Sequence, residues 1–402
     1  MATRDIRRGE LVMEVPALAV TLFKSVTPKQ HAYELDNFGF DATTVALSLS
    51  ALATQEGRSI VAALDIGAHS EPKAAAHVAS RLRQRHPRAL PRDIASLSDA
   101  ELGALCLKVK SNVHRCHDDE TATHAIGLGL YPPAAMFNHS CSPRACFSWS
   151  ADGRVMHVRA LTDVSRGEEV TVSYLAEEQL YAPWEDRRAL LREAFGYVPT
   201  NCLARQRAEE ATMAHGAPSV ALRQRVHDVL GNVRRALATA SAGAAGAAGA
   251  AGAAGRAARS DALADALTQL RGLIDVGLQG AVHPFHWLVQ EAQAALLALA
   301  RTSEVDEPPL VAQSALHLIA AREALMPVGT LHLAALYAAH GSALCRLLGT
   351  GSVQADERAQ VATAAVKSLT AAQAIRTTCL GDAHPIAKAT GAALQHARDA
   401  LK

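Results

Sequence analysis

The pattern of apolar and polar positions differs between the two halves of the chain. Residues 1–200 combine strand-like patterns with a mostly helical stretch over 27–107, whereas residues 203–402 are almost entirely helix-like. In the second half, apolar residues recur on one helix face at Leu333, Leu336, Tyr337, Leu344, Leu347 and Leu348. Paired helices of this length predict a stacked helical-hairpin array. The segment 241–255, with glycine at every third position, predicts a flexible Ala/Gly linker.

Strand-like patterns occur at several places in the first half. Leu11–Val20 is largely apolar and rich in valine, which predicts a strand. The runs Ala145–Ser150 and Val155–Leu161 flank the pair Asp152–Gly153, and an Asp-Gly pair between two such runs predicts a β-hairpin. Apolar residues then alternate with polar neighbours over 170–174, which again predicts a strand.

Two short segments of the first half echo each other. Asp5–Val12 and Asp163–Val170 are both polar runs that end in Gly-Glu before an apolar stretch. We expect Gly9 and Gly167 to supply a backbone angle that other residues resist. Two copies are too few for a repeat array, so the echo predicts two similar strand entries in one small β-fold.

The bulk composition excludes several classes of protein. The chain has 402 residues with 40 Lys and Arg against 39 Asp and Glu, so no large net charge draws it toward nucleic acid or an anionic membrane. Seven scattered cysteines, an odd number, indicate free thiols in a reducing compartment. The charged start lacks the apolar core of a signal peptide, and no apolar run reaches a membrane-spanning length. We therefore expect a soluble protein of the cytoplasm, the nucleus or both.

The densest chemistry lies in Phe137–Arg144, which reads FNHSCSPR. A self-contained zinc finger needs ligands at spacings such as Cys-x-x-Cys, and no such pair accompanies His139 and Cys141. A catalytic Cys–His pair meets in space and is rarely formed by near neighbours in sequence. On spacing alone, the residues favour a third interpretation, a buried polar turn in which Asn138 and the serines bond to nearby backbone.

The order of the surrounding motifs changes this balance. Gly127–Pro133 reads GLGLYPP, Asn138–Pro143 reads NHSCSP, and Gly167–Leu175 reads GEEVTVSYL. This order and spacing resemble the SET-domain protein lysine methyltransferases, most closely the branch in which a MYND zinc finger splits the SET core (the SET-and-MYND, or SMYD-like, family). Ala2–Val20 resembles the first SET strands of that family, and Gly381–Pro385 resembles a turn in its C-terminal helical-hairpin domain. Two motifs in register are a more specific signal than one.

The resemblance implies a site for S-adenosylmethionine. Asn138 and His139 would contact this cofactor, largely through backbone and amide groups, in a segment that threads under the Ser-Tyr segment in a knot-like crossing. Tyr174 would also contact the cofactor, at the place where the methyl group passes to lysine, with its hydroxyl orienting the amine and its ring bordering a narrow channel. The alternative for Tyr174 is a core tyrosine at a strand end. Asn112 resembles the family's cofactor-contacting asparagine, with Ser111 as the other possible alignment.

Two aromatic residues follow in a run that resembles the lead into the family's post-SET segment, Arg187–Tyr197. By that match Phe195 takes the place of a second channel tyrosine, and Tyr197 takes the place of the ring that covers adenine. Ordinary packing explains both residues equally well. In the channel interpretation, the missing hydroxyl of Phe195 predicts a change in the number of methyl groups added.

Three features of the family are missing from the sequence. Its Gly-x-Gly turn would precede Ala2, which predicts that the chain is N-terminally truncated or that this part of the pocket is gone. Residues 21–105 contain no cysteine, so a helical insert takes the place of the MYND finger. The post-SET segment keeps only Cys202 of three cysteines, so Cys141 would be a relic ligand and we predict no metal.

These observations predict an α+β protein: a SET-type β core with a pseudoknot-like crossing and a helical insert, followed by an all-α, TPR-like helical-hairpin domain. The predicted segments are first SET strands over 1–20, the insert over 21–105, the SET core over 106–176, a degenerate post-SET segment over 177–202, and the helical domain over 203–402 with its linker at 241–258. The predicted function is S-adenosylmethionine-dependent methylation of lysine in a histone or non-histone protein, with further protein partners bound by the helical domain. The alternative is a catalytically inactive SET-like scaffold that binds partners through that domain. We expect no direct contact with nucleic acid or a membrane.

Overall fold

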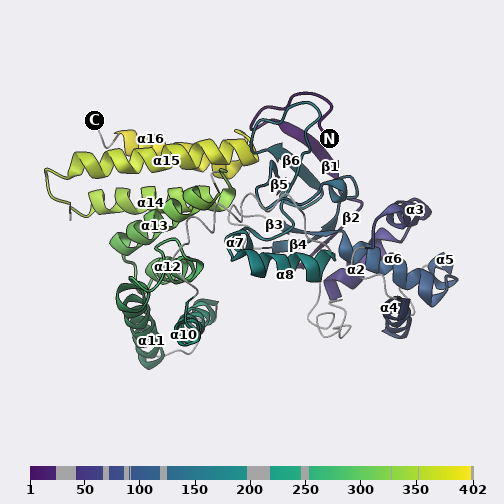
Figure 1. Ribbon diagram of the computed structural model, residues 1–402, viewed down its shortest axis with the longest axis horizontal. Helices are drawn as coiled ribbons and strands as arrows, with labels where there is room; N and C mark the ends of the chain where they lie inside the picture. Colours follow the sequence, from purple (N-terminus) through teal and green to yellow (C-terminus); the bar gives the residue numbers. More distant parts are fainter. Residues whose placement is uncertain are drawn as a thin grey trace. The chain divides into compact units, whose positions relative to one another are not determined.

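The computed structural model describes most of the chain, and Figure 1 shows its elements in order. The described residues are 1–23, 42–66, 72–85, 90, 92–117, 125–196, 218–245, 253–326, 328–351 and 353–399. They fall into two compact units, Met1–Cys202 with Thr378–Gly381, and Leu203–Thr377 with Asp382–Lys402. The first unit mixes strands and helices and the second is helical, which confirms the predicted α+β class of a β core with a helical insert and a helical domain.

The described strands of the first unit form two antiparallel three-stranded sheets. In sheet order these are β1 (Leu11–Pro16), β6 (Val155–Ala160) and β5 (Ala145–Trp149), and then β2 (Ala19–Leu22), β4 (Ala125–Leu130) and β3 (Val113–His117). The predicted hairpin is confirmed, because β5 and β6 pair directly and Gly153 in their turn has a φ of +68°. Every second residue of β6 is buried, so Met156, Val158 and Ala160 face the core.

The sequence predicts one strand over Leu11–Val20, and this prediction is wrong. β1 ends at Pro16, which has no N–H to donate to a sheet ladder. Ala17 N–H still donates to the β5–β6 hairpin, but Leu18 N–H donates to Leu130 C=O at the end of β4 over 2.8 Å. The chain therefore passes from one sheet to the other within two residues. The apolar run gives no sign of this change, because both sheets bury apolar side chains.

The two echoed segments lie opposite each other. Ile6 and Val164 form an antiparallel bridge in which each N–H donates to the C=O of the other over 2.9 Å. The carboxylates of Asp5 and Asp163 each accept a backbone N–H from the opposite segment, over 2.8 and 2.7 Å. The echo thus marks a mutual pairing of two turns, which is more than the two independent strand entries that the sequence suggests.

Each of these turns has the same internal construction. Gly9 and Gly167 have φ values of +83° and +86°, which confirms that both adopt a backbone angle that other residues resist. Glu10 and Glu168 each accept the backbone N–H of the residue three positions earlier, over 3.1 and 2.7 Å. The shared Gly-Glu pair therefore reflects a shared turn geometry.

A helical insert occupies the chain between β2 and β3. Its described helices are α2 (Ala42–Ala51), α3 (Gln55–Ala63), α4 (Pro72–Arg85), α5 (Arg92–Ala95) and α6 (Asp99–Ser111). They share one apolar core with strands β2 and β4, in which Leu47, Leu82, Leu102 and Leu130 are fully buried or nearly so. Because short helices are marginal in isolation, this burial is what holds them.

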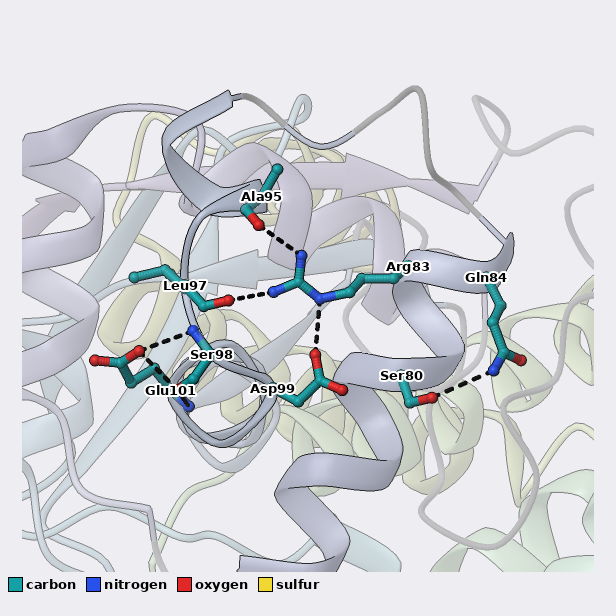
Figure 2. A network of polar contacts seen from close by, with 8 residues as sticks. All are labelled: Ser80, Arg83, Gln84, Ala95, Leu97, Ser98, Asp99 and Glu101. Atoms are coloured by element: carbon teal, nitrogen blue, oxygen red, sulfur yellow. Dashed lines mark hydrogen bonds and ion pairs between the residues drawn. The ribbon is translucent and has the colours of Figure 1, made fainter.

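Arg83 ties α4 to the turn between α5 and α6 (Figure 2). Its guanidinium donates to Asp99 Oδ1 and Ala95 C=O over 2.8 Å each, and to Leu97 C=O. The two carbonyls lie at and just after the C-terminal end of α5, where helical C=O groups lack internal partners. Next to them, Ser98 begins the capping box of α6. A single arginine therefore joins three parts of the insert.

After β4 the chain forms the short 3-10 helix η3 (Ala134–Met136), and after residue 176 it forms α7 (Glu177–Leu180) and α8 (Trp184–Phe195). α8 ends where Gly196 adopts the left-handed conformation with a φ of +74°. This helix end places Phe195 at the end of the described post-SET segment.

The described helices of the second unit are α10 (Val220–Ala245), α11 (Ala253–Gly272), the π-helical turn η5 (Leu273–Leu278), α12 (Trp287–Ala300), α13 (Pro308–Leu325), α14 (Leu331–Gly349), α15 (Arg358–Leu380) and α16 (Pro385–Asp399). Of the predicted linker over 241–258, residues 241–245 belong to α10 and 253–258 to α11, because alanine is the strongest helix former. Residues 246–252 lie outside the described part. Within that part, no helix combines the length and the apolarity needed to cross a bilayer.

Candidate functional site

Two segments of the first unit cross at one parallel bridge. The bridged residues are His139, just after η3, and Val172. Val172 N–H donates to Asn138 C=O over 3.0 Å, and Ser140 N–H donates to Val172 C=O over 2.8 Å. The strand predicted over 170–174 is thus an extended segment with this single bridge, as far as the described residues extend. Its other backbone groups hold the segment after Pro143, since Thr171 C=O accepts two N–H groups there.

His139 lies at the centre of the crossing and is 1% exposed. Its Nδ1 accepts the backbone N–H of Tyr174 over 2.9 Å, so the neutral ring carries its proton on Nε2. Nε2 lies 3.4 Å from Cys141 Sγ, and the imidazole and Tyr174 ring centroids are 5.5 Å apart. Both nitrogens are therefore engaged inside the protein, and the side chain of His139 acts as a support for the Ser-Tyr segment.

Tyr174 and Phe195 form the aromatic part of the site. The Tyr174 hydroxyl donates to the C=O of Phe137 over 2.6 Å, and its ring centroid lies 4.7 Å from that of Phe195 at an interplanar angle of 52°. Tyr174 and Phe195 are each partly buried. The hydroxyl uses its one proton in the hydrogen bond to Phe137 C=O, so toward a ligand the oxygen can act only as an acceptor.

Asn138 lies on the exposed side of the crossing. Its C=O accepts from Val172, as above, and its side-chain Nδ2 donates to Glu169 Oε1 over 2.6 Å. A carboxylate only accepts, so the amide nitrogen must face Glu169 and the amide oxygen must face away from it. The structure therefore brings Asn138, His139, Tyr174 and Phe195 into one connected group.

Asn112 has a different setting at the C-terminal end of α6. Its side-chain Nδ2 donates to Asp65 C=O over 2.7 Å and to Lys108 C=O over 2.8 Å. The neighbouring Ser111 hydroxyl donates to Ile66 C=O over 2.8 Å. These described hydrogen bonds tie the end of α6 to the helical insert rather than to the crossing. Both amide protons are engaged, so Asn112 also offers only its oxygen to a ligand.

The remaining residues of the predicted site lie outside the described part of the chain. These are Tyr197 and Cys202, which is the cysteine that the sequence keeps from the family's post-SET segment. Cys141 is fully buried next to His139. Across the ranges that are described, no group of three or more His, Cys, Asp or Glu side chains is arranged to hold a metal ion.

The charges nearest the crossing come from the Gly-Glu-Glu turn. Arg144 binds Glu168 over 2.7 Å, and this contact, together with the backbone N–H of Ser165, lowers the pKa of the Glu168 carboxyl. Glu168 is therefore committed to its own turn and to Arg144. Glu169, the next residue, is the carboxylate that reaches Asn138.

Two contributors to the site were not identified from the sequence. Glu169 orients the side chain of Asn138, and its signal was the second acidic residue of the Gly-Glu-Glu run. Phe137 contributes its C=O to the hydroxyl of Tyr174. A backbone carbonyl has no signature in the sequence, because every residue carries one.

Comparisons with known proteins bear on the same part of the chain. The model of the SET domain family matches residues 1–175. The N-lysine methyltransferase SMYD2-B of Xenopus laevis is 28% identical over 130 residues, which cover 28% of this chain and 29% of the relative. Human N-lysine methyltransferase SMYD2 is 36% identical over 81 residues, covering 20% of this chain and 17% of the relative. The SMYD2-B of Danio rerio is 34% identical over 95 residues, covering 24% and 20%.

These alignments span less than a third of the length of each relative. The family match includes the crossing, with its NHSC and Ser-Tyr motifs, and ends at the residue after Tyr174. Residues 1–175 of this chain are therefore similar to a SET domain, and stretches within the chain are similar to the SMYD2 N-lysine methyltransferases.

Proposed function

We propose that this chain is an S-adenosylmethionine-dependent protein-lysine N-methyltransferase. The observation that carries the proposal is the crossing itself: the NHSC segment and the Ser-Tyr segment are far apart in sequence, yet Tyr174 N–H donates to His139 Nδ1 over 2.9 Å. Cofactor contacts predicted for Asn138 and His139, and transfer chemistry predicted for Tyr174, thus fall on one connected group of residues. The SET match over residues 1–175 supports the same reaction class.

Tyr174 would orient the lysine amine. Its hydroxyl donates to Phe137 C=O, so toward the amine the oxygen can act only as an acceptor of an N–H. An amine held by its N–H presents its own lone pair in a defined direction, and in-line placement is what a methyl transfer from sulfonium requires. Phe195, in contact with the Tyr174 ring, would form the apolar wall beside it.

The donor groups of the crossing fit the proposed cofactor. S-adenosylmethionine, when bound, supplies an activated methyl group on a sulfonium, and it also carries an ammonium and an adenine amino group as hydrogen-bond donors. Asn112 has both amide protons engaged within the protein, and Asn138 has its NH2 group held against Glu169, so each presents an amide oxygen. Acceptor oxygens of this kind match N–H donors of the cofactor. We also assign Tyr197 to the adenine, as the sequence suggests.

The substrate would be a lysine of another protein, histone or non-histone. The helical unit of α10 to α16 would bind protein partners, since helical-hairpin arrays present extended surfaces. We further propose that the protein works in the cytoplasm, the nucleus or both, in keeping with Cys106, Cys116 and Cys146, none of which forms a disulfide.

The test combines binding and turnover on the purified chain. S-adenosylmethionine is titrated into the protein in a calorimeter, and transfer of a labelled methyl group is then measured on core histones and on an array of lysine-containing peptides. We expect saturable binding and a mass increase confined to lysine. Binding without transfer to any substrate would argue for a narrow substrate choice or a missing part of the protein, and a panel of cell extracts with labelled donor separates these two.

The competing function, an inactive SET-like scaffold, makes the opposite prediction. It expects no heat at saturating S-adenosylmethionine and no labelled lysine in any extract. That combined result would overturn the enzymatic proposal and leave the helical unit as the functional part of the chain.

A further inference from the structure

The amide of Asn138 has a fixed polarity, and the group that fixes it is Glu169. Asn138 Nδ2 donates to Glu169 Oε1 over 2.6 Å, so the NH2 end of the amide faces the carboxyl group. Asparagine can present either its oxygen or its NH2 group to a ligand, and the two ends differ only in hydrogen-bonding character. A carboxylate beside one end removes that choice, because it can only accept.

Glu168 and Glu169 are adjacent in sequence but make different contacts. Glu168, one position earlier, binds Arg144 and closes its own turn by accepting Ser165 N–H. Glu169 has its described hydrogen bond to Asn138 and none to a cation in that part of the chain. The two adjacent acidic residues therefore have separate roles, one in the turn and one at the crossing.

Asn112 provides an independent parallel. Its Nδ2 donates to two backbone carbonyls, which also only accept, so its amide oxygen is likewise the group left for a ligand. The two asparagines predicted to bind cofactor thus have the same polarity, although different partners impose it. Glu169 is the one of these partners that is a side chain, and so the one that a substitution can remove.

From this geometry we infer that Glu169 is a positioning residue that holds the Asn138 amide with its oxygen toward the ligand, so that the site selects a ligand bearing N–H donors. The inference rests on the proposed function for the identity of the ligand, S-adenosylmethionine. Glu169 touches neither the cofactor nor the substrate in this account. Its contribution is to remove the alternative orientation of Asn138, in which an NH2 group would face the donors of the ligand.

The first test is ligand binding by single variants. In Glu169→Ala the amide of Asn138 is free to turn, and we expect the affinity for S-adenosylmethionine to fall about three- to tenfold. The KM for the cofactor should rise by the same factor, while kcat at saturation stays within about twofold of the wild type, because only binding is affected. Glu168→Ala is the matched control: it should lower the thermal midpoint through its turn and leave cofactor affinity unchanged.

The second test is rescue by exchange of the two groups. Asn138→Asp places two carboxylates against each other and should bind cofactor more weakly than Glu169→Ala. The double variant Asn138→Asp/Glu169→Gln restores a donor–acceptor pair, with the glutamine NH2 facing one aspartate oxygen and the other oxygen left for the ligand. We expect its affinity to recover to within a few-fold of the wild type. A double variant no better than Asn138→Asp would overturn the inference.

Two further readouts separate this account from its rivals. If the loss in Glu169→Ala disappears at high salt, Glu169 acts through its electric field and not by orienting Asn138, which overturns the inference. The side-chain NH2 signals of Asn138, followed by NMR without any ligand, should shift in Glu169→Ala and not in Glu168→Ala. Wild-type protein that binds no S-adenosylmethionine defeats the proposed function. Wild-type binding with equal affinity in Glu169→Ala defeats only the inference about Glu169.

Discussion

Tyr174 donates its backbone N–H to Nδ1 of His139 over 2.9 Å, across 35 positions of sequence. The imidazole is buried, and its second nitrogen lies next to Cys141 Sγ. Because both nitrogens are engaged, the ring has one orientation, and the backbone that carries the Tyr174 phenol takes its position from that ring. The side chain of His139 is therefore a structural support, whatever its backbone contributes to cofactor binding.

Removing this support should destabilise the first unit. His139→Ala leaves the Tyr174 N–H buried without an acceptor, which costs about 1–3 kcal/mol. His139→Asn retains an oxygen close to the position of Nδ1 and should recover most of the loss. The midpoint of thermal unfolding, followed by circular dichroism, measures both variants. Equal midpoints for His139→Ala and the wild type would show that the hydrogen bond carries no net stability.

Tyr174→Phe removes the hydroxyl and leaves the ring. The amine would lose its acceptor, and we expect kcat to fall by about 10²-fold, the scale for loss of one preorganised hydrogen-bonding group in an active site. Affinity for S-adenosylmethionine should change little, since the ring at position 174 and the other proposed cofactor contacts, Asn138, His139 and Asn112, are all retained. Methyl transfer to a reactive peptide and calorimetry measure the two quantities. Tyr337→Phe in α14, which also loses a hydroxyl hydrogen bond, is the control and should retain full activity.

Phe195→Tyr tests the aromatic wall. The Phe195 ring lies 4.7 Å from the Tyr174 ring between centroids, so in the proposed site a hydroxyl added to this ring would lie beside the amine. An added hydroxyl reduces the volume open to a methylated amine and binds one of its N–H groups, and we expect fewer methyl groups per lysine. Mass spectrometry of a peptide product reads this directly. An unchanged distribution of mono-, di- and trimethyl products would show that Phe195 does not border the amine.

Gly167→Ala tests the backbone of the second turn. Gly167 has a φ of +86° and no heavy atom within 4 Å of the added Cβ, so the substitution costs only backbone strain, about 1–2 kcal/mol. Gly231→Ala in α10 is the matched control, because it also adds a methyl group in open space but in a helix, and should stabilise by about 0.5–1 kcal/mol. Thermal midpoints that move in the same direction for both variants would contradict the strain argument.

His114 predicts a loss of stability in mild acid. Burial lowers the pKa of His114 from 6.5 to about 4, and its ring packs edge-on against Tyr131 and Phe147 at 5.8 and 5.3 Å. Below pH 6.5 the His114 imidazole binds a proton in the unfolded chain but not in the folded chain. The free energy of unfolding therefore falls between pH 6.5 and about 4.

His114→Gln should reduce this slope, and the part that remains includes the contribution of His286, whose pKa burial also lowers to about 4. The same substitution at His227, which is 74% exposed on α10, is the control and should leave the curve unchanged. Denaturant unfolding at several pH values measures the slope. A slope in His114→Gln equal to that of the wild type would mean that another group is responsible for the acid sensitivity.

Local patterns were sufficient for part of the fold. The Asp152–Gly153 pair predicted the β5–β6 hairpin, because turn chemistry acts over four residues. Gly9 and Gly167 were recognised as special backbone positions for the same reason. The recurrence of apolar residues at helical spacing likewise predicted α14.

The same local patterns did not predict which strands and turns pair with each other. One apolar run over Leu11–Val20 became two strands in two sheets, since hydrophobic periodicity reports that a residue is buried and not which strand lies beside it. The echo of Asp5–Val12 in Asp163–Val170 was visible, but the mutual bridge of Ile6 and Val164 was not. Pairings of this kind depend on loop closure and on the competition among all strands.

The sequence by itself determined which residues are candidates for the chemistry, because Asn138, His139 and Tyr174 stand in motifs whose order is written along the chain. Only the tertiary structure decided what their atoms face. It set the buried nitrogen of His139 against a backbone N–H, the hydroxyl of Tyr174 against a backbone C=O, and the amide of Asn138 against Glu169. The physical reason is that residue type fixes the supply of donors and acceptors, whereas hydrogen bonds are made within about 3 Å, a distance that only the folded chain establishes.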